Sequence, residues 1–243
     1  MKFTAEYRVD THDTDLKGIA SATSVIQYIQ ESANLQHEAY GPKLDDLRKS
    51  GKAFILSRMA IDFLRPLKAQ DIVKVETWLN EAKGYGYLRN SRLTRGDELV
   101  ARMTAFWGVI DIPTRKLLRA EEIELGFGTD PEEVSTDAGI RFRIPKELEL
   151  SKLGDYKVVY RDCDENLHMN NTQYPGVFCD FLPEMQRSRI TGLSINYQHE
   201  AKLGCSFEIF GARDGDVIYI RTRLDDGNVG AEAMMSISSE EAN

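Results

Sequence analysis

Tyr156-Lys157-Val158 and Asp162-Cys163-Asp164 repeat, in the same relative positions, Tyr7-Arg8-Val9 and Asp13-Thr14-Asp15 near the start of the chain. A repeat of this kind indicates two copies of one structural unit. In each copy a strand-like pattern leads into a polar turn, and a helix-like pattern follows the turn. The sequence therefore predicts a fold built from two related halves.

The helix of the first copy has the clearer pattern. Between Ala22 and Tyr40 apolar residues recur at the spacing of a helix that buries one face. Ser21 or Thr23 can cap its start, and Gly41-Pro42 ends it. The simplest place to bury such a helix is against a sheet.

Strand patterns follow the helix in both copies. Between residues 53 and 111 they alternate with turns, which is typical of an antiparallel meander. A helix pattern at about 174–182 and later strands repeat this order. We expect an α+β fold with two copies of a long helix wrapped by an antiparallel β-sheet, and we expect the exposed sheet edges to pair.

An acidic, turn-forming segment separates the two copies. It contains Asp130-Pro131-Glu132-Glu133 and Ser135-Thr136-Asp137, which are typical of a linker. We therefore predict an N-terminal unit at 1–125, a linker at 126–145 and a C-terminal unit at 146–243.

The charge and the cysteines narrow the class of protein. The net charge of −8 argues against a general nucleic-acid binder. No apolar run is long enough to span a membrane, and no apolar signal region opens the chain. Cys163, Cys179 and Cys205 cannot all pair, and they form no C-x-x-C motif. We therefore expect a cytoplasmic protein.

The second copy carries a polar cluster. Asp164, Asn166 and His168 occupy alternate positions, so in an extended segment their side chains would share one face. An Asp beside a His can fix one imidazole tautomer, as in many acyl-transfer sites. A polar turn without a function is the simpler alternative. A calcium loop starting at Asp162 is excluded, because its sixth position is Leu167 rather than Gly.

The first copy differs from the second at these positions. Lys17 stands in line with Asn166, and Ile19 stands in line with His168. Residues that served only as turn formers in both halves would not diverge in this way. We therefore expect a functional site in the second half only.

The stretch from Asp164 to Tyr174 follows the motif D-x-N-x-H-x-N-N-x-x-Y. Tyr197-Gln198-His199-Glu200 continues the pattern with an aromatic residue, two polar residues and a Glu. On these residues the chain resembles the acyl-[acyl-carrier-protein] thioesterases, specifically the bacterial relatives of the plant fatty-acid enzymes, over nearly its whole length. Three stretches of the first half match further landmarks of this family: Ser57-Arg58-Met59, Glu76-Thr77-Trp78 and Phe106-Trp107. The resemblance implies a tandem (double) hotdog fold.

The same resemblance implies an activity. The expected reaction is hydrolysis of the thioester of fatty acyl-[acyl-carrier-protein] to free fatty acid and carrier protein, which ends chain elongation in fatty acid biosynthesis. The resemblance implies no cofactor and no metal. The expected partner is an acyl carrier protein and not a nucleic acid, and a homodimer is one possible assembly of the chain.

Thioester hydrolysis needs an activated water and donors for the oxyanion that develops on attack. Glu200 is the candidate base, and Pro66 stands in line with it in the first copy. His168 and Asn166 would polarise the carbonyl or position the water, and Asp164 would orient them. The roles of His168 and Glu200 could be exchanged.

One departure from the family bears on the nucleophile. The plant enzymes that the chain resembles carry Cys directly after the motif Glu, where this chain has Ala201. A nucleophilic cysteine is therefore not available at that position, and direct attack by water is favoured.

The first half is predicted to hold the acyl chain. Val25, Ile29 and Ala33 lie on the apolar stripe of its helix, and Met59 and Ile61 lie on the strand predicted to face that helix. Each buried methylene of a fatty chain contributes about 0.8 kcal/mol, which favours an apolar layer of this kind. A packed core without a ligand is the alternative.

Three other functions stay open. An acyl-CoA thioesterase would use the same chemistry on a different carrier. A hotdog-fold enoyl-thioester hydratase also uses Asp and His, but its usual D-x-N-x-x-H spacing fits this chain poorly. A non-catalytic acyl-binding protein is the third alternative, and the complete polar set speaks against it.

Overall fold

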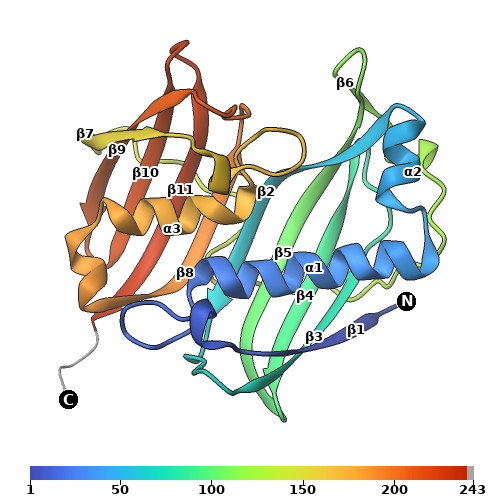
Figure 1. The fold of residues 1–243 in the computed structure, drawn as a ribbon, viewed down its shortest axis with the longest axis horizontal. Coiled ribbons are helices and arrows are strands. Elements are labelled where there is room, and N and C mark those ends of the chain that lie inside the picture. Colours follow the sequence, from blue (N-terminus) through green and yellow to red (C-terminus); the bar gives the residue numbers. More distant parts are fainter. Residues whose placement is uncertain (240–243) are drawn as a thin grey trace.

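The structure, a computed structural model, describes residues 1–239. The last four residues of the predicted C-terminal unit, 240–243, lie outside the described residues. One curved, continuous antiparallel sheet runs through both halves in the order β1-β3-β4-β5-β2-β8-β11-β10-β9-β7, and β6 pairs with β5 (Figure 1). The long helix α1 and the shorter α3 lie on the same side of the sheet (Figure 1).

Within residues 1–239, the first half contains six strands and two α-helices, and the second half contains five strands and one α-helix. The elements of the first half are β1 (Phe3–Arg8), α1 (Ala22–Tyr40), α2 (Leu44–Lys49), β2 (Lys52–Phe63), β3 (Ile72–Leu79), β4 (Gly86–Arg95), β5 (Glu98–Asp111) and β6 (Lys116–Leu118). Those of the second half are β7 (Ser151–Lys157), α3 (Tyr174–Asp180), β8 (Ser188–Tyr197), β9 (Ser206–Asp214), β10 (Val217–Leu224) and β11 (Val229–Ser239). Short 3-10 helices connect several of these elements.

The bounds of α1 follow from its two ends. The Ser21 hydroxyl accepts a hydrogen bond from the Ser24 backbone at 3.1 Å and caps the start. Gly41 ends the helix with a φ of 76°, a left-handed conformation that glycine adopts without steric cost. The helix predicted from Ala22 to Tyr40 is therefore confirmed. The helix of the second half was predicted at about 174–182, and α3 is slightly shorter, since it ends at Asp180.

Strands β2 and β8 join the two halves. Met59 pairs with Ile195 and Ile61 pairs with Leu193 in an antiparallel register. All four side chains are fully buried, which continues one core across the boundary. The predicted pairing of the two sheet edges is confirmed.

The segment between the halves covers the other face of the sheet. The Trp78 indole donates to the Glu132 carbonyl at 2.8 Å, and the Ser194 hydroxyl donates to the Gly139 carbonyl at 2.6 Å. The Asp62 carboxylate accepts the backbone N–H groups of residues 137 and 138. The central strands are therefore buried on both faces.

Within residues 1–239, no helix is both long and apolar enough to span a bilayer.

Candidate active site

The polar cluster of the second half forms a tight turn. The Asp164 backbone N–H donates to the His168 carbonyl at 2.9 Å, and the Asp164 carboxylate accepts the Asn166 backbone N–H at 2.8 Å. Leu167 has a φ of 59°, in the left-handed region. The interpretation of this segment as extended, with alternate side chains on one face, is therefore wrong. Asp164 shapes the turn through the Asn166 backbone, and among the described residues no hydrogen bond joins it to the His168 ring.

The first half contains the same turn with different side chains. The Asp15 backbone N–H donates to the Ile19 carbonyl at 2.8 Å, and the Asp15 carboxylate accepts the Lys17 backbone N–H at 2.8 Å. Gly18, with a φ of 72°, takes the place of Leu167. The two halves therefore share a backbone at this point and differ in what the side chains can do.

His168 and Glu200 come together beside the turn. His168 Nε2 lies 3.6 Å from Glu200 Oε2, and the side chains are 22% and 35% exposed, so both can reach solvent and substrate. An antiparallel bridge between His168 and Lys202 fixes the two backbone segments against each other. The same Glu200 oxygen accepts a hydrogen bond from Arg115 Nη2 at 2.5 Å. Arg115 lies in the turn between β5 and β6, so the first half contacts the candidate base.

Two further contacts place the site at the boundary between the halves. Arg48 of α2 forms an ion pair with Glu165, inside the turn. The Gln27 amide of α1 donates to the Thr172 hydroxyl at 3.4 Å. The contacts of Arg48 with Glu165 and of Arg115 with Glu200 were not predicted, because nothing in the spacing indicates that an arginine of one half meets an acid of the other.

The cysteines are poorly suited to act as nucleophiles. Burial raises the pKa of the Cys179 thiol to about 12. Burial, with the carboxylates of Asp162 and Asp164, raises the pKa of Cys163, and burial raises that of Cys205. A thiol with a raised pKa holds little thiolate at neutral pH.

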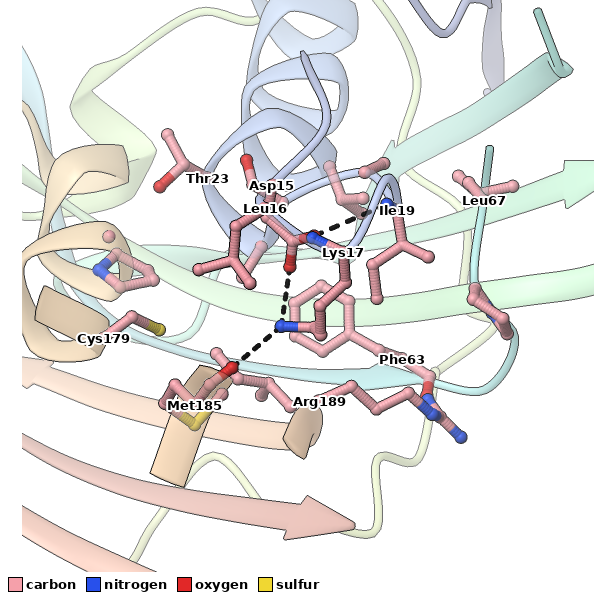
Figure 2. A pocket seen from close by; sticks show the side chains of 18 of the residues that line it. Asp15, Leu16, Lys17, Ile19, Thr23, Phe63, Leu67, Cys179, Met185 and Arg189 are labelled. Carbon is pink, nitrogen blue, oxygen red and sulfur yellow. Dashed lines mark hydrogen bonds and ion pairs between the residues drawn. The ribbon is translucent and has the colours of Figure 1, made fainter. Parts of the chain in front are cut away.

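The corresponding region of the first half contains an ion pair between Lys17 and Asp15. A cavity of about 480 Å³ lies between the turn at residues 15–20 and helix α3 (Figure 2). Lys17 Nζ lies 2.9 Å from Asp15 Oδ2 and donates to the Met185 carbonyl at 3.0 Å. Cys179 lies in the opposite wall (Figure 2). The lysine in the place of Asn166 is therefore already paired, and this half has no imidazole at its turn.

The five residues predicted to bind the acyl chain do not line one pocket. Ile29 and Ala33 line a small cavity between α1 and the sheet, and Ala33 also lines a neighbouring cavity of about 110 Å³. Val25 lines the 480 Å³ cavity instead. Met59 and Ile61 are fully buried in the core.

Two family models match this chain, one in each half. Residues 1–124 match the family model described as the acyl-ACP thioesterase N-terminal domain, and residues 145–240 match the acyl-ACP thioesterase C-terminal domain. The chain belongs to the acyl-ACP thioesterase family. The resemblance seen in the sequence is thereby confirmed.

This acyl-ACP thioesterase family member is similar to a chloroplastic oleoyl-acyl carrier protein thioesterase of Coriandrum sativum, with 21% identity over 225 residues. The alignment covers 83% of this chain and 60% of the plant protein, so the chain spans about 60% of that relative's length. A relative from Arabidopsis thaliana, oleoyl-acyl carrier protein thioesterase 2, is 22% identical over 220 residues, which cover 81% of this chain and 59% of that protein.

Solved structures show the fold. An acyl-ACP thioesterase from Bacteroides thetaiotaomicron superimposes with a TM-score of 0.79 at 18% identity, over 98% of both chains. The 12:0-ACP thioesterase from Umbellularia californica superimposes with a TM-score of 0.77 at 15% identity, over 98% of this chain and 94% of that one. The predicted double hotdog fold is confirmed.

Proposed function

We propose that this chain hydrolyses the thioester of fatty acyl-[acyl-carrier-protein], releasing a free fatty acid and the carrier protein and ending chain elongation in fatty acid biosynthesis. The observation that carries the proposal is the 3.6 Å approach of His168 Nε2 to Glu200 Oε2 at the boundary between the halves. Membership of the acyl-ACP thioesterase family supports the reaction class.

In the proposed mechanism Glu200 is the general base. Its carboxylate removes a proton from a water as the water oxygen attacks the thioester carbonyl carbon. The electron pair of the carbonyl moves to its oxygen, and N–H groups of His168 and Asn166 stabilise the negative charge there. The carbon–sulfur bond then breaks, and the proton held by Glu200 passes to the leaving sulfur. The products are the fatty acid and the carrier thiol.

The proposed partner is an acyl carrier protein, which we expect to be acidic. Basic side chains lie on two exposed segments beside the site: Arg48 and Lys49 on α2, which also carries Asp45 and Asp46, and Arg115, Lys116 and Arg119 around β6. Opposite charges on two exposed surfaces mainly raise the rate of encounter, and salt screens them within roughly 10 Å at 0.1 M. The three free cysteines agree with a cytoplasmic location.

One assay separates the proposed function from its alternatives. Release of free thiol is measured from acyl-[acyl-carrier-protein] and from acyl-CoA of the same chain length, in parallel with hydration of an enoyl thioester. We expect faster thiol release from the carrier protein, with a KM that rises with salt. Equal efficiency on acyl-CoA would favour an acyl-CoA thioesterase, and hydration without thiol release would contradict hydrolysis altogether.

A further inference from the structure

The layer between α1 and the first-half sheet contains two buried N–H donors that lack an acceptor. Gln30 Nε2 and Trp107 Nε1 are both inaccessible to solvent, and within residues 1–239 neither donates a hydrogen bond. Both side chains line the same small cavity, together with Ile29 and Ala33 of the predicted acyl site. A buried donor without an acceptor is unfavourable, and native structures seldom keep one without a reason.

The same cavity has a buried arginine in its wall. Arg89 is 5% exposed and lines the cavity beside Gln30 and Trp107. Its guanidinium donates to Gln36 Oε1 at 2.7 Å and to Thr77 Oγ1 at 3.2 Å. In the described part of the chain no carboxylate forms an ion pair with it. Its positive charge is therefore held by neutral partners only, which is an unusual arrangement for a buried ion.

His37 does not supply the missing negative charge. Its Nδ1–H donates to the Pro42 carbonyl at 3.2 Å, which leaves Nε2 to accept from Arg89 Nη2 at 3.3 Å. Burial, together with the positive charge of Arg89, lowers the pKa of His37 to about 4, so the ring is neutral at pH 7. Burial lowers the pKa of Arg89 to about 9, which still leaves the guanidinium protonated at pH 7.

Some of these polar groups also line a second cavity that reaches Arg48. Ala33, Arg89 and Trp107 also line the neighbouring cavity of about 110 Å³. Arg48, which forms the ion pair with Glu165 in the catalytic turn, lines that cavity as well. An acyl chain that starts at the turn and enters between α1 and the sheet would therefore pass the unpaired donors.

We propose that this thioesterase prefers acyl chains that carry a hydroxyl or oxo oxygen over saturated chains of the same length. A saturated chain in this layer leaves the N–H groups of Gln30 and Trp107 unpaired, whereas an oxygen on the chain accepts from them. The positive charge of Arg89 nearby further favours an electron-rich oxygen. A site built to donate hydrogen bonds discriminates against the analogue that lacks the acceptor. The inference rests on the proposed function and specifies its substrate class.

The test compares kcat/KM for carrier-protein thioesters of one chain length: the saturated chain, and chains with a hydroxyl or an oxo group at successive positions. We expect at least one oxygenated chain to exceed the saturated chain by roughly 10-fold or more. Gln30→Leu and Trp107→Phe keep much of the shape and remove the donor. Each should lower the ratio of kcat/KM for the preferred oxygenated chain to kcat/KM for the saturated chain by about 10-fold.

Thr104→Val is the matched control. Thr104 Oγ1 is also buried without a partner, but Thr104 alternates along β5 with the cavity-lining residues Met103 and Ala105 and therefore faces the other side of the sheet. We expect this variant to leave the preference unchanged. Equilibrium binding of hydroxylated and saturated free fatty acids to the unmodified protein provides a second measurement that needs no variant, and tighter binding of the hydroxylated acid is expected.

Three results would overturn the inference. Saturated chains could be hydrolysed as efficiently as every oxygenated chain, which would leave the proposed function intact. The preference for oxygen could persist in both Gln30→Leu and Trp107→Phe, which would place the acceptor site elsewhere. Hydrolysis of no thioester at all would reject the proposed function together with this inference.

Discussion

Glu200 Oε2 lies 3.6 Å from His168 Nε2, a distance at which one water molecule can contact both groups. The two residues come from separate segments, and the backbone bridge between His168 and Lys202 sets their approach. The corresponding positions of the first half hold Ile19 and Pro66, which can neither accept nor donate a proton through their side chains. The two halves therefore share one backbone scaffold at this point. The second half carries His168 and Glu200, a pair suited to acid–base chemistry.

Arg115 is expected to hold the Glu200 carboxylate in position from the other half. Arg115→Ala removes the hydrogen bond between them, and we expect kcat for thioester hydrolysis to fall by roughly 10-fold, as for loss of one charged hydrogen bond. Arg115→Gln, which can still donate, should recover part of the loss. Arg119→Ala, an exposed arginine just after β6, is the control and should leave kcat within about 2-fold. Equal losses in Arg115→Ala and Arg119→Ala would point to carrier-protein docking instead.

Cysteine is expected to be dispensable. A variant with Cys163, Cys179 and Cys205 all replaced by Ala or Ser should hydrolyse thioesters at a near-normal rate, because the thiol pKa values are raised and Ala201 follows Glu200. Circular dichroism would confirm that the variant folds. An acyl group trapped covalently on any of the three thiols of the native chain would show that this expectation is wrong.

Leu167 stores backbone strain in the turn at residues 164–168. A left-handed conformation costs a side-chain-bearing residue about 1–2 kcal/mol, and glycine loses about 0.5–1 kcal/mol through chain entropy. Leu167→Gly should therefore raise the free energy of unfolding by up to about 1 kcal/mol in urea denaturation. Gly18→Ala makes the opposite change in the first-half turn. No atom lies within 4 Å of the added Cβ. The expected loss of about 1 kcal/mol in the free energy of unfolding therefore comes from the backbone conformation alone. Two changes of the same sign would refute this account.

His37 makes stability sensitive to acid. Its pKa is about 4 in the folded chain, below the value of 6.5 for an exposed histidine, so the unfolded chain binds a proton more readily. Its contribution to stability is complete above pH 6.5 and is lost as the pH falls from 6.5 towards 4, by about 3 kcal/mol in total. Urea denaturation at several pH values, with His37→Gln, measures this loss. The slope of the free energy of unfolding against pH should flatten in His37→Gln. It should stay unchanged in the control His12→Gln, which replaces an exposed histidine.

Local signals in the sequence predicted much of the fold. The bounds of α1 follow from Ser21 and Gly41, and the repeat identified equivalent turns in both halves. The geometry of the second turn was not predictable, because a left-handed Leu167 has no sequence signature, whereas Gly18 in the first turn does. The ion pairs from Arg48 and Arg115 were also missed, since they depend on how the halves pack.

The prediction of the acyl site was limited in the same way, because it also depends on how separate elements pack. The apolar stripe of α1 identified Ile29 and Ala33, which do line a cavity, but the periodicity of one helix cannot show which residues lie across from it. Arg89 and Trp107, on strands β4 and β5, make the inner part of that layer polar. Sequence alone could not distinguish the cavity-lining Ile29 from Met59, which is closed into the core.

One pair of variants tests whether the chemistry belongs to the second half alone. His168→Ala and Ile19→Ala change the same position of the two equivalent turns. We measure kcat/KM for thiol release from acyl-[acyl-carrier-protein] with both, after confirming that each folds. A catalytic role for His168 predicts a fall of about 10²–10⁴-fold for His168→Ala and a change within about 3-fold for Ile19→Ala. Similar losses in the two variants, or full activity in His168→Ala, would contradict it.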